Sequence, residues 1–122
     1  MQGLHVYGTA TCSTCRRAMR WLADGGFEVT VADITVTPPP RHLLVLALGQ
    51  VGRSRMLNTS GRRYRELGAA TVRAWSDEEL LDALASDGRL LKRPFLVIPG
   101  GVILTGFHPE QWQAALVAQA SP

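Results

Sequence analysis

The first 34 residues carry the pattern that most restricts the fold, because strand, helix and strand signals follow one another within one short unit. A short apolar run from Leu4 ends at Gly8 and predicts a strand. From Ser13 apolar residues repeat at helical spacing, and Asp24-Gly25-Gly26 ends that helix. Residues 27–34 begin with alternating apolar and polar side chains, which predicts a second strand. Such a unit gives two parallel strands joined by a right-handed crossover.

The last third has a different pattern, in which two short apolar runs precede a helix. Residues 94–98 and 102–104 flank Pro99-Gly100-Gly101, and this arrangement predicts a β-hairpin. Pro109 then begins a final helix whose apolar positions include Trp112. The order β-α-β, helices, β-β-α predicts an α/β domain with a mixed four-stranded sheet covered by helices. This is the order of the thioredoxin-like fold.

The segment between these two parts reads as helical. Residues 41–48 form a dense apolar run that Gly49 and Gly52 break, and residues 60–67 form a short polar helix. Ser76-Asp77-Glu78-Glu79 has the spacing of a capping box, so it begins another helix, which ends at Asp87-Gly88. We therefore expect helices, and no further strand, in the middle of the chain.

Length and composition bound the class of protein. With 122 residues, 46% of them hydrophobic, the chain is expected to form a single domain over residues 1–122. Two cysteines are too few for a disulfide-dense secreted scaffold. No apolar run approaches the ~20 residues of a membrane span, and no signal peptide is visible, so we expect a cytoplasmic protein with no membrane partner. A net charge of +3 is too small to indicate direct nucleic acid binding.

Cys12-Ser13-Thr14-Cys15 stands between the first predicted strand and its helix, which is the context of a redox-active Cys-x-x-Cys pair. Cys12 would lie at the helix N-terminus, where free amides and the helix dipole stabilise a thiolate. Cys15 follows one turn later and would attack a mixed disulfide formed at Cys12. Arg16 and Arg17 add positive charge beside the thiol. We therefore expect Cys12 to be the nucleophile and Cys15 the resolving thiol.

Two other interpretations compete with a redox-active cysteine pair. Cys15 lies on the apolar face of the predicted helix, and a buried cysteine is often an unreactive part of the core. A zinc site needs more ligands, and no second pair of them has metal-site spacing, so we predict no metal. The other candidate ligands are His5, His42 and His108.

Lys92-Arg93-Pro94 precedes the predicted hairpin. In the proposed fold, a proline just before the third strand faces the Cys12 end of the helix, and X–Pro bonds are where cis peptides occur. We expect a cis Arg93–Pro94 bond, with Arg93 directed toward Cys12 to stabilise its thiolate or to hold an anionic substrate. The alternative is an exposed arginine at the start of an edge strand.

Further segments, taken together, are more specific than any one motif. In chain order, and including the two motifs above, they are Tyr7-Gly8 with Cys12–Ala18, Thr37-Pro38-Pro39, Leu57-Asn58-Thr59, Tyr64–Gly68, Lys92-Arg93-Pro94 and Gly106-Phe107. In these segments the chain resembles the arsenate reductase (ArsC)-like family, which includes the Spx-type redox regulators. The resemblance spans nearly the whole chain. It implies a thioredoxin-like core with a helical insertion between the βαβ and ββα parts.

The resemblance also bears on the site, and there the sequence departs from the family pattern. The family's arsenate reductases hold their oxyanion with several arginines and take their second thiol from glutathione and glutaredoxin. Arg93 matches one of these arginines, whereas the positions near Asn58 and Gly106 carry none. Arg62 or Arg63, which follow Asn58 in the sequence, are candidates to substitute for a missing arginine.

These departures, and the presence of a second thiol in the chain itself, favour a cytoplasmic thiol–disulfide oxidoreductase. The predicted catalytic residues are Cys12, Cys15 and Arg93, and the predicted substrate-binding residues are Arg16, Pro94, Arg62 and Arg63. No bound cofactor is expected, and the reductant is a thiol such as glutathione, glutaredoxin or thioredoxin. Two alternatives stay open: an Spx-type regulator that binds RNA polymerase, and a glutathione- and glutaredoxin-dependent arsenate reductase.

Overall fold

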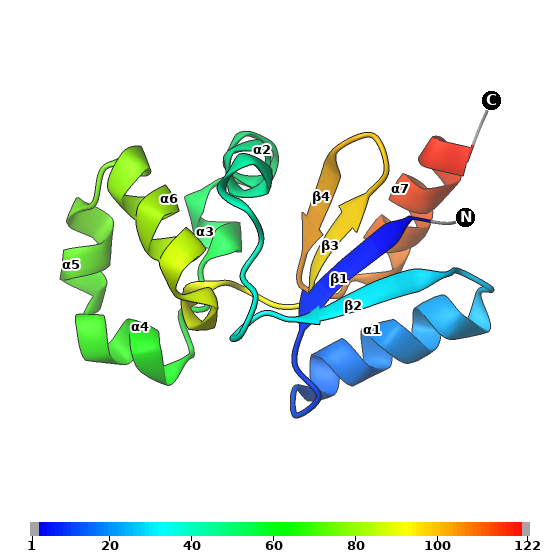
Figure 1. Cartoon of the computed structure of the whole chain (residues 1–122), viewed down its shortest axis with the longest axis horizontal. Coiled ribbons are helices and arrows are strands. Elements are labelled where there is room, and N and C mark those ends of the chain that lie inside the picture. The colour runs from blue at the N-terminus through cyan, green and yellow to red at the C-terminus, as the bar shows by residue number, and fades with distance from the viewer. Residues whose placement is uncertain (1–2, 121–122) are drawn as a thin grey trace.

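A mixed four-stranded sheet in the order β2-β1-β3-β4 forms the centre of the computed structural model, which describes residues 3–120 (Figure 1). β1 (Leu4–Gly8) pairs in parallel with β2 (Val29–Asp33) and antiparallel with β3 (Phe95–Ile98). β3 pairs antiparallel with β4 (Val102–Thr105). The predicted α/β fold is confirmed, and the predicted span 1–122 extends beyond the described residues at both ends.

The helices lie in two groups on either side of this sheet (Figure 1). α1 (Ser13–Asp24) and α7 (Pro109–Ala120) belong to the βαβ and ββα parts. The remaining helices form the insertion between those parts: α2 (Arg41–Val51), α3 (Arg53–Met56), α4 (Arg62–Leu67), α5 (Ala69–Ala74), α6 (Asp77–Ser86) and the 3-10 turn η1 (Gly88–Leu90). Over residues 3–120, no helix is long and apolar enough to cross a membrane.

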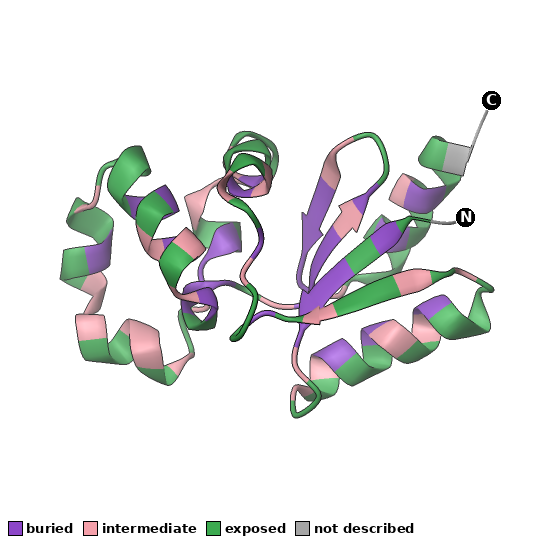
Figure 2. Ribbon diagram, viewed as in Figure 1, coloured by how far each residue is buried: buried purple, intermediate pink, exposed green. Residues whose placement is uncertain are grey.

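Two buried clusters hold these layers together (Figure 2). In β3, Leu96 packs with the fully buried Trp112 of α7, while Phe95 packs with the insertion. Successive side chains of a strand point to opposite faces, so the sheet supplies apolar residues to both clusters. The C-terminal end of β1 and the N-terminal end of β3 are thereby held between the two groups of helices.

The structure corrects the expected element bounds in several places. Of the two glycines expected to break the apolar run, Gly49 lies inside α2, whereas Gly52 does end the helix, and its φ of 80° suits glycine. The short helices α3 and α5 were not predicted, because neither contains enough turns to show an apolar period. The second strand is shorter than residues 27–34, and its Val31 is 55% exposed because β2 is an edge strand.

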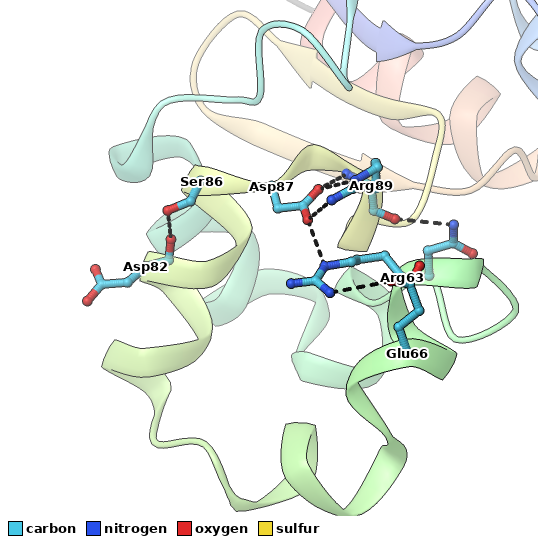
Figure 3. A network of polar contacts seen from close by, with 7 residues as sticks. Arg63, Glu66, Asp82, Ser86, Asp87 and Arg89 are labelled. Carbon is cyan, nitrogen blue, oxygen red and sulfur yellow. Dashed lines mark hydrogen bonds and ion pairs between the residues drawn. The ribbon is translucent and has the colours of Figure 1, made fainter.

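Polar contacts around Asp87 fasten the end of α6 to α4 (Figure 3). The Asp87 carboxylate accepts hydrogen bonds from the guanidinium groups of Arg63 and Arg89, at 3.1 Å and 2.8–2.9 Å. It also accepts from the backbone N–H of Arg89 and so caps the turn η1. These bonds hold the pKa of Asp87 below its usual range, since the Arg89 hydrogen bond favours the carboxylate. The loop between α6 and β3 is thereby set in place beside α4.

Candidate active site

Cys12 is the N-cap residue of α1, immediately after the turn that follows β1. Its sulfur accepts a hydrogen bond from the backbone N–H of Cys15 at 3.3 Å, as an N-cap side chain does. The first turn of α1 contains no acidic residue, so nothing there opposes a negative charge at the helix N-terminus. The structure therefore places a partly exposed thiol where a thiolate is stabilised.

Cys15 lies one turn further along α1 and is only 3% exposed. Its side chain packs against Gly8, the last residue of β1: a Cβ atom on Gly8 would lie 2.9 Å from the sulfur of Cys15. Gly8 therefore lets α1 approach the strand closely enough to bury the second thiol. A glycine at this point is needed for space rather than for an unusual backbone angle.

We expect Gly8→Ala to lower the free energy of unfolding by about 1–3 kcal/mol, because the added methyl group overpacks the contact with Cys15. Urea denaturation of the reduced protein measures this change. Gly49→Ala is the matched control, since a Cβ there meets nothing within 4 Å. Equal stabilities for the Gly8→Ala variant and the wild type would show that the α1–β1 contact is looser than the structure has it.

The two thiols differ in their acidity. Burial opposes ionisation of Cys12, but hydrogen bonds from the Cys15 thiol and backbone, together with the positive charge of Arg93, outweigh it and lower the pKa of Cys12. Burial raises the pKa of Cys15 to about 11, and the hydrogen bond with Cys12 adds to this effect. Of the two thiols, Cys12 is therefore the one that ionises at the lower pH.

Arg93 shares a cavity of about 330 Å³ with Cys12, and its half-buried side chain supplies part of the positive potential there. The Arg93–Pro94 bond is cis, as the sequence predicted. Pro94 itself is buried, and its carbonyl accepts a hydrogen bond from the N–H of Gly106 at 2.9 Å. The cavity is completed by the loop between α3 and α4, with Leu57, Asn58, Thr59, Ser60 and Gly61, and by Thr14 and Lys92.

A second cavity of about 490 Å³ adjoins the first, since both are lined by Asn58, Gly61 and Arg93. It contains both Arg62 and Arg63. Arg63 is engaged by Asp87 and by Glu66 (Figure 3), whereas Arg62 makes no ion pair with a described carboxylate. Of these two predicted substrate-binding residues, Arg62 is thus the one whose charge is available to a ligand.

Arg16 lies elsewhere. Its guanidinium donates a 2.8 Å hydrogen bond to the carbonyl of Ala10, which fastens the turn before Cys12. It lines a third, more apolar cavity of about 370 Å³ beside Cys15, Met19 and Val31. The structure therefore does not bring Arg16 into the Cys12 cavity, although it helps to shape the loop that presents Cys12.

The sequence marked Asn58 only as a position without the family's arginine, and Lys92 only as part of the motif before Pro94. Both line the Cys12 cavity. The signal that could have found them is their position, because each lies within a segment that carries the resemblance. No group of three described His, Cys, Asp or Glu side chains is arranged to hold a metal ion.

Comparison with known proteins agrees with this architecture. The sheet order and the helix that begins at Cys12 define a protein of the thioredoxin-like class. The model of the ArsC family matches residues 7–115, and the chain belongs to the ArsC family. The chain is 30% identical over 106 residues to the arsenate reductase of Escherichia coli strain K12, which covers 85% of this chain and 74% of that protein.

Relatives of similar length are closer in sequence. YusI of Bacillus subtilis, described as uncharacterised, is 36% identical over 113 residues, which is 90% of this chain and 95% of YusI. Among solved structures, a possible arsenate reductase from Streptococcus mutans has 36% identity and a TM-score of 0.80, covering 90% of this chain and 97% of that one. An ArsC family related protein from Bacteroides fragilis has 32% identity and a TM-score of 0.82, covering 91% and 95%. The family supports a thiol-dependent reductase.

Proposed function

We propose that this chain is a thiol–disulfide oxidoreductase of the cytoplasm, without a bound cofactor, that uses Cys12 and Cys15 as its redox pair. The observation that carries the proposal is the contrast between the two thiols. Cys12 is partly exposed at the start of α1 with a lowered pKa, and Cys15 is buried one turn away with its pKa raised to about 11. This is the division expected of an attacking and a resolving thiol.

The reaction then runs in two exchanges. The Cys12 thiolate attacks one sulfur of a substrate disulfide, so that a Cys12–substrate bond forms, the substrate bond breaks, and the other substrate sulfur leaves and takes up a proton. Cys15 loses its proton and attacks the sulfur of Cys12, which releases the second substrate thiol. The substrate gains two electrons, and the protein is left with a Cys12–Cys15 disulfide. An external thiol, such as glutathione, glutaredoxin or thioredoxin, returns the two electrons.

Formation of the mixed disulfide itself activates Cys15. Burial is the largest cause of the raised pKa of Cys15, and the hydrogen bond and the charge of Cys12 add to it. Those two contributions vanish once the Cys12 sulfur is bonded to substrate, while the positive charge of Arg93 continues to lower the pKa of Cys15. The pKa of Cys15 is thus expected to fall when the mixed disulfide forms.

Arg93 acts in this proposal by stabilising the Cys12 thiolate and by holding an anionic group of the substrate in the shared cavity. Arg62, which has no carboxylate partner among the described residues, extends that binding into the adjoining cavity. Arg63 and Arg16 act as supports, because each is already engaged within the protein. Pro94 contributes through the backbone beside Arg93.

Arsenate reduction is a second candidate, since arsenate reductases are among the relatives at 30% identity or more. A doubly charged oxyanion needs several donors close to the nucleophile. The Cys12 cavity offers Arg93 and Lys92 but has Asn58 where the resemblance leads us to expect an arginine. We therefore expect arsenate turnover with glutathione and glutaredoxin to be far below that of the Escherichia coli enzyme in the same assay. Comparable rates would favour this second function.

A coupled assay tests the proposed function. Reduction of a small uncharged disulfide is followed with glutathione and glutathione reductase, and in parallel with thioredoxin and its reductase. We expect turnover by the wild type with at least one reductant, and none by Cys12→Ser. Absence of turnover with every thiol donor, together with retention of RNA polymerase on the immobilised protein, would instead support the Spx-type regulator.

A further inference from the structure

A cavity of about 490 Å³ lies between the insertion and the corner that joins β4 to α7, outside the site described above. Val51 and Arg55 line it from the end of α2 and from α3. The corner contributes Leu104, Thr105, His108, Glu110 and Gln111, and Lys92 completes the lining. Its size is within the range of small-ligand sites. We refer to it as the Lys92–Arg55 groove.

The groove is positively charged. Arg55 and Lys92 are exposed cations, and neither makes an ion pair with any carboxylate over residues 3–120. Other arginines of the insertion, such as Arg41 and Arg53, are paired with acidic side chains of α6. One carboxylate, that of Glu110, lies in the groove and reduces the excess positive charge.

A second observation at the groove concerns Thr105. This residue is 5% exposed, and its hydroxyl has no hydrogen-bond partner among the described residues. A buried hydroxyl without a hydrogen-bond partner carries a free-energy cost. A polar ligand atom or a bound water at this place would remove that cost by forming the missing hydrogen bond. It lines the groove beside the first turn of the 12-residue helix α7, whose free N–H groups also favour an anion.

Lys92 joins this groove to the active site, because it lines both the groove and the Cys12 cavity. Its stem lies over Gly106: a Cβ atom at that position would be 3.1 Å from Cε of Lys92. Any larger residue at position 106 would displace the lysine, and the φ of 70° also favours glycine there. Gly106 therefore makes room for a cation between the two cavities.

We propose that the Lys92–Arg55 groove binds an acidic stretch of peptide chain next to the cysteine that Cys12 attacks, so that the preferred substrates are disulfides of acidic peptides. The inference rests on the proposed function. Its basis is charge complementarity. Arg93 and Lys92 line the Cys12 cavity, and Lys92 and Arg55 line the groove next to it, so the two cavities together present positive charge to an acidic peptide. Lys92 is the specificity-determining residue, since it is common to both cavities.

The test uses three peptides of equal length, each with one cysteine joined to 2-thiopyridine as a mixed disulfide and flanked by acidic, neutral or basic residues. Release of the uncharged thione reports the attack by Cys12. We expect the wild type to prefer the acidic over the neutral peptide in kcat/KM. Lys92→Gln and Arg55→Gln should each reduce that preference by about 2–5-fold, as for single exposed ion pairs.

Glu110→Gln is a variant for which we expect the opposite change in peptide preference. Removing this carboxylate should increase the preference for the acidic peptide by a similar factor, because the groove then no longer holds a negative charge that repels the peptide's acidic residues. Arg20→Gln is the matched control: Arg20 is exposed on α1, outside all four cavities, and its loss changes the net charge by the same amount as the two groove variants. We expect it to leave the ratio of acidic to neutral kcat/KM unchanged.

Two outcomes separate this inference from the proposed function. Equal kcat/KM for the three peptides, with rapid Cys12-dependent turnover, would overturn the groove assignment and leave the oxidoreductase standing. Should no peptide react, calorimetric titration with the same peptides carrying serine in place of cysteine still tests whether the groove prefers an acidic peptide. Tighter binding of the acidic peptide, weakened by Lys92→Gln, supports it, and equal binding of all three overturns it.

Discussion

Cys12→Ser is expected to lose disulfide reduction on the order of 10³-fold or more, because a serine hydroxyl does not ionise near neutral pH and forms no mixed disulfide. The fold should survive, since Cys12 is partly exposed and a serine hydroxyl also caps a helix. Steady-state turnover of a small disulfide measures the loss, and circular dichroism checks the fold.

Cys15→Ser should fail at a different step. The first exchange still occurs at Cys12, but no second thiol releases the product, so the protein should accumulate as a mixed disulfide with half of the substrate. Intact-mass spectrometry of the variant after one addition of substrate detects this adduct. An adduct on the Cys12→Ser variant in place of the Cys15→Ser variant would reverse the roles of the two cysteines.

Arg93→Ala is expected to raise the pKa of Cys12, because the variant loses a positive charge that stabilises the thiolate. The positive charge of Arg93 is one of the causes that hold this pKa low, and the side chain is only half-buried, so solvent moderates its effect. The Cys12 thiolate gains population as pH rises through its pKa, so the variant should react more slowly than wild type at neutral pH and approach it under alkaline conditions. Thiolate absorbance from pH 4 to 10, in a Cys15→Ser background, measures the shift.

Arg93→Lys and Arg20→Ala are the controls for this titration. The lysine keeps the charge without the planar guanidinium and should restore part of the shift, whereas the loss of the outward-facing Arg20 on α1 should change little. Superimposable titration curves for Arg93→Ala and the parent protein would mean that Arg93 does not act on Cys12.

Much of the core was predictable because its signals are local. The strand-helix-strand unit, the hairpin at Pro99-Gly100-Gly101 and the capping box at Ser76–Glu79 each depend on a few neighbouring residues, and each is present in the structure. The insertion was less predictable. Short helices such as Ala69–Ala74 are fixed by packing against distant elements, which leaves no clear period in their own sequence.

The candidate site divides in the same way. Cys12 and Arg93 could be singled out because a helix N-terminus and a residue before proline have recognisable sequence contexts. The loop residues that line the same cavity, such as Asn58, meet Cys12 and Arg93 only through the tertiary fold. Arg63 and Arg62 look equivalent in sequence. In the structure Arg63 is engaged by Asp87, whereas Arg62 has no carboxylate partner over residues 3–120.

Cys12 is the nucleophile in the proposed mechanism, and the rate of alkylation at each cysteine tests this assignment most directly. The reduced wild type is treated briefly with iodoacetamide at pH 7, and the labelled site is identified by mass spectrometry. With the pKa of Cys15 at about 11, only about one Cys15 thiol in 10⁴ is ionised at this pH, so nearly all label should appear on Cys12. Label on Cys15 first, or equally on both thiols, would contradict the account.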